Sequence, residues 1–159
     1  MRVTRSLAIG LTLIIAASGC TTSEPSLKEA TAELQKDTHL LETDDLFKNP
    51  LMNLHILQRP DKDVPCGENG FKRVLRATAD EERKKEESTD TYLDTAERVM
   101  QNTLSKTLGY KIEYDTTQID TPEGRFIKGI KNTGVSVDVY VSPEAPTWRL
   151  RAQTACLPK

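Results

Sequence analysis

The spacing of apolar residues predicts two amphipathic helices. Apolar residues recur every three or four positions in residues 26–42 and again in residues 91–108, which is the spacing of one buried helix face. Each stretch opens with a hydroxyl residue and has an acidic residue three positions later, a pattern that satisfies the free amides of a helix start. Asp37 falls outside the first apolar stripe and is expected to face solvent. Gly109 follows the second stretch and can take the left-handed conformation that ends a helix.

Alternation of apolar and polar residues predicts five strands. The clearest is the run of alternate valines in residues 135–141. The other four expected strands cover residues 71–79, 110–114, 125–131 and 148–156. A shorter alternation in residues 51–57 predicts a strand or an extended segment laid over the core. Residues 80–87 are all charged and are expected to form a solvated loop or the first turn of a helix.

The amino-terminal segment has the pattern of a lipoprotein signal peptide. Two arginines precede an apolar run at residues 7–17, which is too short to cross a bilayer core of about 30 Å. Ser18 and Gly19 then lead to Cys20, whose thiol can accept a diacylglyceryl group before cleavage. The alternative interpretation is an ordinary secretory signal in which Cys20 is incidental. Lipidation would hold the mature protein at the outer face of the cell membrane.

The chain that follows has the length of a single domain. Residues 1–19 form the expected signal peptide, residues 20–25 a polar tether and residues 26–159 one domain. Of the 22 basic and 24 acidic side chains, the signal removes two basic ones, which leaves 20 and 24 and a net charge of −4. A mildly acidic domain has no general attraction to nucleic acid, so no nucleic-acid partner is expected.

Cys66 and Cys156 are expected to form a disulfide bond. With Cys20 acylated, these two thiols remain as a pair in an oxidising compartment. The chain-entropy model credits a closed loop of about 90 residues with at most about 4 to 5 kcal/mol. The alternative is two buried free thiols. Neither cysteine has a CxxC motif or a nearby histidine, so no metal site is predicted.

The expected bridge and the loop lengths together predict a topology. Short loops join the four strands after Gly109 into an antiparallel meander. The bridge places the first strand beside the last, which gives the order 1-5-4-3-2 when the five strands are numbered along the chain. Strands 1 and 2 are then parallel and need a crossover, which residues 91–108 supply. The expected fold is α+β: a five-stranded, mainly antiparallel sheet with this helix and the N-terminal helix on one face, and a disulfide-closed core over residues 66–156.

The opposite face of this sheet is expected to collect basic side chains. The candidates for an interaction face are Lys72, Arg76, Arg149, Arg151 and Tyr140. The alternative is an ordinary solvated face, because polar alternation is usual on the exposed side of an antiparallel sheet.

Several short motifs occur in a particular order along the chain. A lipobox ending at Cys20 precedes an N-terminal helix, a cysteine before the strand FKRVLRATAD, a helix ending in LGYKIEY, a TPEG turn and a terminal TACLP. In this order the motifs resemble small actinobacterial surface lipoproteins of unknown function. The resemblance implies the fold and the location, and it supplies no catalytic residues.

The sequence favours a binding role over catalysis. Its two histidines, His39 and His55, lie near no nucleophile, metal or phosphate-loop motif, so we expect neither an enzyme nor a cofactor. The first hypothesis is a non-catalytic interaction module, bound to membrane lipid through Cys20, whose open sheet face contacts another envelope protein or an anionic wall component.

Two other hypotheses remain at this stage. The alternative is a small-ligand or lipid-binding envelope protein with a cavity between the first helix and the sheet, near Trp148 and Met52. An enzyme would need a cleft that holds His55 within hydrogen-bond reach of a carboxylate.

Overall fold

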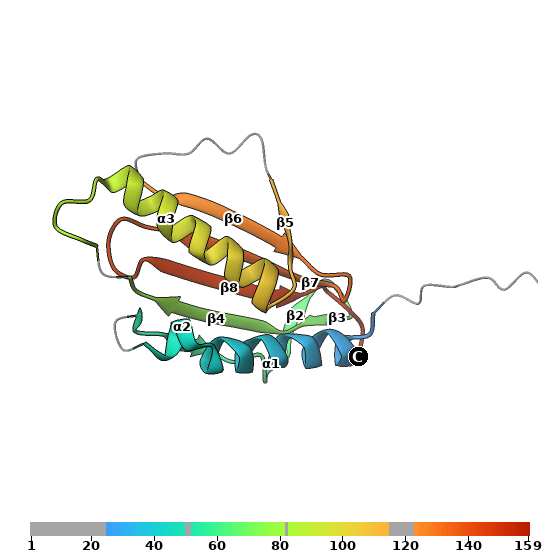
Figure 1. Ribbon diagram of the computed structural model, residues 1–159. Helices are drawn as coiled ribbons and strands as arrows, with labels where there is room; N and C mark the ends of the chain where they lie inside the picture. The colour runs from blue at the N-terminus through green and yellow to red at the C-terminus, as the bar shows by residue number, and fades with distance from the viewer. Residues whose placement is uncertain (1–24, 50–51, 82, 115–122) are drawn as a thin grey trace, which may run out of the picture.

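The computed structural model describes residues 25–49, 52–81, 83–114 and 123–159, and these residues form an α+β domain. The expected signal peptide and Cys20 lie outside them. The main sheet has six strands in the order β1-β4-β8-β7-β6-β5, and every neighbouring pair is antiparallel (Figure 1). These strands are β1 (His55–Gln58), β4 (Val74–Ala79), β5 (Lys111–Glu113), β6 (Arg125–Ile130), β7 (Val135–Val141) and β8 (Trp148–Thr154).

Two long helices cover one face of this sheet (Figure 1). Helix α1 (Leu27–Thr43) packs on β7 and β8, and helix α3 (Thr89–Asn102) packs on β6 and β7. The last turn of α3 continues as a π-helical segment, η2 (Thr103–Thr107), and a short helix, α2 (Asp45–Lys48), follows α1. The helices bury the alternate valines of β7 and the aliphatic residues of β4 and β8, which form the core.

The helix signals in the sequence are largely confirmed. Ser26 and Glu29 form a capping box, with the Glu29 backbone N–H donating to the Ser26 hydroxyl at 3.2 Å. Helix α3 begins two residues earlier than predicted, because the hydroxyl of Ser88 and not that of Thr91 caps its start. Gly109 has a φ of 76° and ends the helical segment as expected.

The predicted sheet differs from the observed one in detail. The five expected strands keep their predicted order, but β1 pairs with the outer side of β4, so the sheet has six strands and the first expected strand is not its edge. Residues 51–57 were predicted as a strand or an extended segment, and strand β1 begins within them, at His55.

The strand expected at residues 71–79 is in fact two strands. Its first part is β3 (Gly70–Lys72), which pairs with β2 (Val64–Cys66) in a separate hairpin, and the remainder is β4. The break falls at Arg73, whose backbone N–H donates to the Thr154 hydroxyl and whose guanidinium pairs with Asp63 at 2.8 Å. These contacts turn the chain out of the main sheet.

The two cysteines are placed to form the predicted disulfide bond. The Cα atoms of Cys66 and Cys156 are 5.8 Å apart, within the range of disulfide-bonded pairs. The pair joins the β2–β3 hairpin to the chain just after β8. Phe71 and Leu157 reinforce this junction with two backbone hydrogen bonds of 2.8 and 3.0 Å.

Candidate functional site

The face of the sheet opposite the helices carries the predicted basic side chains. Arg76 on β4 lies directly opposite Arg151 on β8. On the other side of β8, Arg151 lies opposite Asp138 and Arg149 lies opposite Tyr140, both on β7. Because side chains alternate between the two faces of a strand, all five share the open face.

A groove of about 720 Å³ lies on this face, lined in part by residues of the β2–β3 hairpin. Lys72, Arg76, Arg149 and Arg151 supply its cationic side chains, so four of the five predicted residues come together in one groove. The fifth, Tyr140, does not line it. Its hydroxyl donates to the Glu123 carbonyl at 2.7 Å, and the Arg149 guanidinium lies 5.7 Å from its ring centre. Tyr140 therefore holds Arg149 in place instead of lining the groove.

The lining of the groove is basic, and Asp138, which lies opposite Arg151 on β7, is not part of it. No acidic side chain lines it among the residues that the structure describes. None of its four cations forms an ion pair with a described residue. Like charges that face each other across two strands repel, so the Arg76 and Arg151 pair costs stability. The unfavourable repulsion would be relieved by an anion in the groove.

The structure adds an apolar part of the groove that the sequence did not reveal. Leu57 on β1, Val64 and Pro65 on β2, and Val74 on β4 line it together with the cations. The two hairpin strands are three residues each, too short to produce a periodic pattern. Gly67, with a φ of 69°, was the available signal for a turn between them.

The ligand cavity expected near Trp148 is filled by side chains. Trp148 is 1% exposed, its indole N–H donates to the Ala96 carbonyl at 3.2 Å, and its ring meets Phe47 edge-on. The cavity that Trp148 lines has a volume of about 10 Å³, far below that of an organic ligand site. Met52 is also buried, so the prediction of a ligand cavity at this place is wrong.

His55 lacks the surroundings of a catalytic histidine. Its side chain is exposed and forms no hydrogen bond with any residue that the structure describes. Glu42 lines the same open surface depression, but Arg59 binds its carboxylate. No group of three or more histidine, cysteine or acidic residues suited to a metal ion occurs among the described residues.

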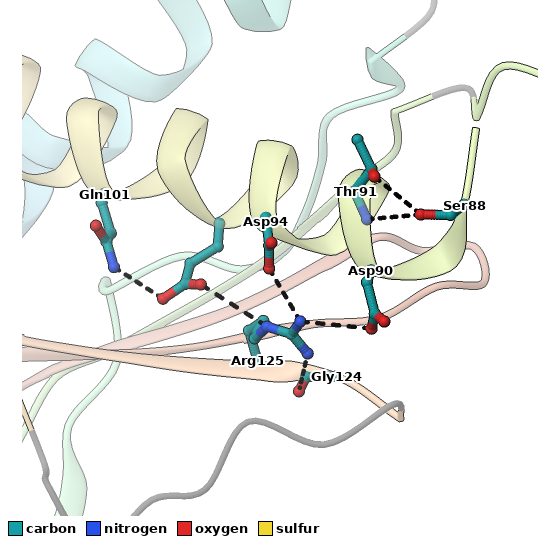
Figure 2. A network of polar contacts seen from close by, with 8 residues as sticks. Ser88, Asp90, Thr91, Asp94, Gln101, Gly124 and Arg125 are labelled. Carbon is teal, nitrogen blue, oxygen red and sulfur yellow. Dashed lines mark hydrogen bonds and ion pairs between the residues drawn. The ribbon is translucent and has the colours of Figure 1, made fainter.

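A buried Arg125 ties β6 to α3. Its side chain is 6% exposed, and its guanidinium lies 2.9 Å from Asp94 and 3.7 Å from Asp90 (Figure 2). The Glu97 carboxylate lies 4.0 Å from the Arg125 Nε. All three acids project from one side of α3 because they are spaced three or four residues apart. The Arg125 guanidinium thus links β6 to α3 through ion pairs.

A second buried polar cluster joins α1 to the chain just before β5 and just after β6. Asp37, which the sequence pattern placed outside the apolar stripe, is 1% exposed. The Lys131 amine donates to Asp37 at 2.6 Å and to Glu33 at 2.8 Å, and the Tyr110 hydroxyl donates to Asp37 at 2.7 Å. The prediction that Asp37 faces solvent is wrong, because Lys131 and Tyr110, both distant in sequence, donate hydrogen bonds to its buried carboxylate.

The surroundings shift the pKa values of this cluster in different directions. Burial raises the pKa of the Asp37 carboxyl, although Lys131 and Tyr110 oppose the shift. A hydrogen bond from Lys131 lowers the pKa of Glu33. Burial, together with the Asp37 charge, raises the pKa of the Tyr110 phenol. The polar groups of Glu33, Asp37, Tyr110 and Lys131 are thus paired with one another.

The fold and the groove define an α+β domain that presents a cationic groove on an otherwise open sheet face. No protein-family model matches the chain, and no curated protein matches it in sequence. Among solved structures it is similar to a DUF4853 family protein from Actinomyces odontolyticus, with 17% identity and a TM-score of 0.45 over 85% of this chain and 70% of that chain. No helix in the described part of the chain is long and apolar enough to cross a membrane.

Proposed function

We propose that this protein is a non-catalytic binding module, held at the outer face of the cell membrane through Cys20, whose groove binds an anionic partner in the cell envelope. The observation that carries the proposal is the gathering of Lys72, Arg76, Arg149 and Arg151 in one groove whose described lining includes no acidic side chain. Arginine forks bind carboxylate or phosphate through two parallel hydrogen bonds. A partner of that chemistry would relieve the repulsion within the groove.

Replacing Arg149 and Arg151 with glutamate is expected to weaken binding to isolated envelope material by at least about tenfold, because each hydrogen bond to a charged group contributes about 1.5–3 kcal/mol. Sedimentation of the purified variant with that material measures the effect. The wild-type interaction should also weaken as salt is added, since the partly exposed charges are screened.

The matched control is the pair Arg98→Glu and Lys106→Glu. Both residues are exposed on the helical side of the domain, so the double variant has the same change in net charge outside the groove. It should bind as the wild type does. If the groove variant binds envelope material as well as this control, the proposed role of the groove is wrong.

Anchoring through Cys20 rests on the sequence pattern at residues 7–20, which lies outside the described residues. The five residues between Cys20 and Ser26 span at most about 18 Å when extended. The start of α1 would therefore lie close to the membrane surface.

Cys20→Ser is expected to abolish labelling of the protein by a fatty-acid analogue in cells and to release it from the membrane fraction. Ser18→Ala, which keeps a small residue before the cysteine, should be labelled normally. Release of the wild type by high salt alone would contradict the lipid anchor, because acyl chains are not displaced by salt.

The alternative function, a small-ligand or lipid-binding envelope protein, is favoured by one other feature. A groove of about 730 Å³ lies between the start of α1 and the chain end, lined by Leu27, Ala32 and Leu157 among others. Mass spectrometry of organic extracts of the purified protein distinguishes this alternative, since it requires a co-purifying apolar ligand.

A further inference from the structure

The lining of the cationic groove is apolar as well as charged. Leu57, at 60% exposure, stands on one side of the groove, and Val64 and Pro65 stand on the hairpin side. The side chains of Leu57, Val64 and Pro65 have no polar atom, so they present carbon to whatever fills the groove. From the combination of charge and apolar surface we infer that the partner is an extended acidic segment of a protein that also carries an apolar side chain. The inference rests on the proposed function and specifies the partner of the same groove.

The spacing of the arginines fits an extended peptide. Arg149 and Arg151 are two residues apart on β8 and point to the same face. Side chains at this separation repeat every 6.6–6.8 Å or so along a strand. Alternate residues of a second extended chain repeat at the same interval. Two carboxylates at positions i and i+2 of the partner can therefore meet both guanidinium groups at once.

The third arginine widens this anionic subsite across the sheet. Arg76 lies on the neighbouring strand, directly opposite Arg151. Residues opposite each other in a sheet have Cβ atoms about 4.5–5.5 Å apart, so one carboxylate can lie between the two side chains. Such a contact would offset the repulsion between Arg76 and Arg151 with two charge-assisted hydrogen bonds.

The apolar wall distinguishes a peptide from a bare polyanion. A phosphate chain in the groove would place charged oxygens against Leu57, Val64 and Pro65, where they would lose water and gain no hydrogen bond. An aliphatic side chain at the same place gains about 25 cal/mol for each Å² of apolar surface that it buries. The groove thus offers most to a ligand that has both kinds of group.

The decisive experiment compares peptide probes on the mature, full-length protein by fluorescence anisotropy. The first probe has glutamate at positions i and i+2 and leucine at i+4, so that all three side chains project from one side of the extended chain. The second probe replaces this leucine with serine at unchanged charge, and inorganic polyphosphate is the third. We expect the leucine probe to bind at least about tenfold more tightly than the serine probe. Leu57→Ser should remove this preference and leave polyphosphate binding unchanged.

Ile130→Ser serves as the matched control variant. Ile130 is 39% exposed on the same open face but does not line the groove. This variant should keep the preference for the leucine probe. Thermal unfolding of both variants checks that the fold is retained, since each loses an exposed side chain.

Different outcomes overturn different statements. Equal binding of the two peptides, or tighter binding of polyphosphate or of phosphatidylglycerol vesicles, would overturn the acidic-segment inference and leave an anion-binding groove. Self-association of the protein that excludes the probes would overturn it in favour of a second copy as partner. If no anionic probe binds and envelope material does not bind either, the proposed function itself fails.

Discussion

Replacing Lys131 with methionine is expected to lower the free energy of unfolding by about 3 kcal/mol at pH 7, because removal of one partner of a buried ion pair leaves an uncompensated charge. The Lys131 side chain is 6% exposed and bridges Asp37, at 1% exposure, and the partly exposed Glu33. Urea unfolding followed by circular dichroism measures the loss. A change below about 1 kcal/mol would show that the cluster contributes little.

The difference in unfolding free energy between the wild type and Lys131→Met should become smaller as the pH is lowered. The raised pKa of Asp37 means that its contribution to stability is present below its unfolded pKa and is lost as the pH rises through its folded pKa. Without Lys131 this folded pKa rises further, so the variant gains stability as Asp37 protonates. Glu33 acts in the opposite direction, because its pKa is lowered in the folded wild type. The stability that Glu33 contributes there is lost as the pH falls through its folded pKa. Equal deficits at pH 7 and pH 4 would contradict this assignment.

Two control variants separate charge from packing. Lys36→Met removes a lysine whose side chain is 64% exposed and whose amine is 3.8 Å from Glu33, so it should change stability by no more than about 0.5 kcal/mol. Asp37→Asn combined with Lys131→Met should recover part of the lost stability. The amide is uncharged, and its oxygen still accepts the hydrogen bond from the Tyr110 hydroxyl. A double variant as unstable as the single one would point to lost packing instead.

Removal of the disulfide bond should have the second large effect. The double variant Cys66→Ala and Cys156→Ala is expected to have a free energy of unfolding lower than that of the wild type by at most about 4–5 kcal/mol. The bond closes a loop with a sequence separation of 90, and this loop restricts the unfolded chain. Guanidinium unfolding with and without a reductant measures it. The wild type should approach the variant when it is reduced, and the variant should not respond.

The same variant tests the wall of the groove. Val64 and Pro65 lie on the hairpin that Cys66 fastens, so loss of the bond should weaken groove binding more than Lys131→Met does. Cys156 is exposed, and in the native protein it should not react with a thiol reagent. A native protein that reacts at both cysteines without unfolding has no such bond.

The sequence predicted those parts of the fold that have a regular period. The stripe of α1 and the alternate valines of β7 are buried as expected, since each follows the repeat of its element. The pairing of Asp37 with Lys131 could not be predicted, because the two residues are 94 positions apart and charged residues are assigned to the surface by default. Strand β1 is only four residues long, and its region was predicted as a strand or an extended segment without a partner in the sheet.

The basic side of the groove was predicted and its apolar side was not. Alternation on β4 and β8 placed Arg76, Arg149 and Arg151 on one face, and the expected bridge made the two strands neighbours. The hairpin was hidden because the pattern of residues 71–79 resembled one continuous strand. Only the tertiary contacts of Arg73 show that the chain turns there.

The start of α1 and the end of the chain lie at the same end of the domain, since Pro25 and Leu157 line one groove (Figure 1). The loop between β4 and α3 lies at the opposite end. For a protein held by Cys20, a reporter fused after Lys159 would lie between the domain and the bilayer, on the side where Lys159 pairs with Asp63. An epitope inserted within residues 83–87 would instead extend outward, where antibodies can reach it on intact cells.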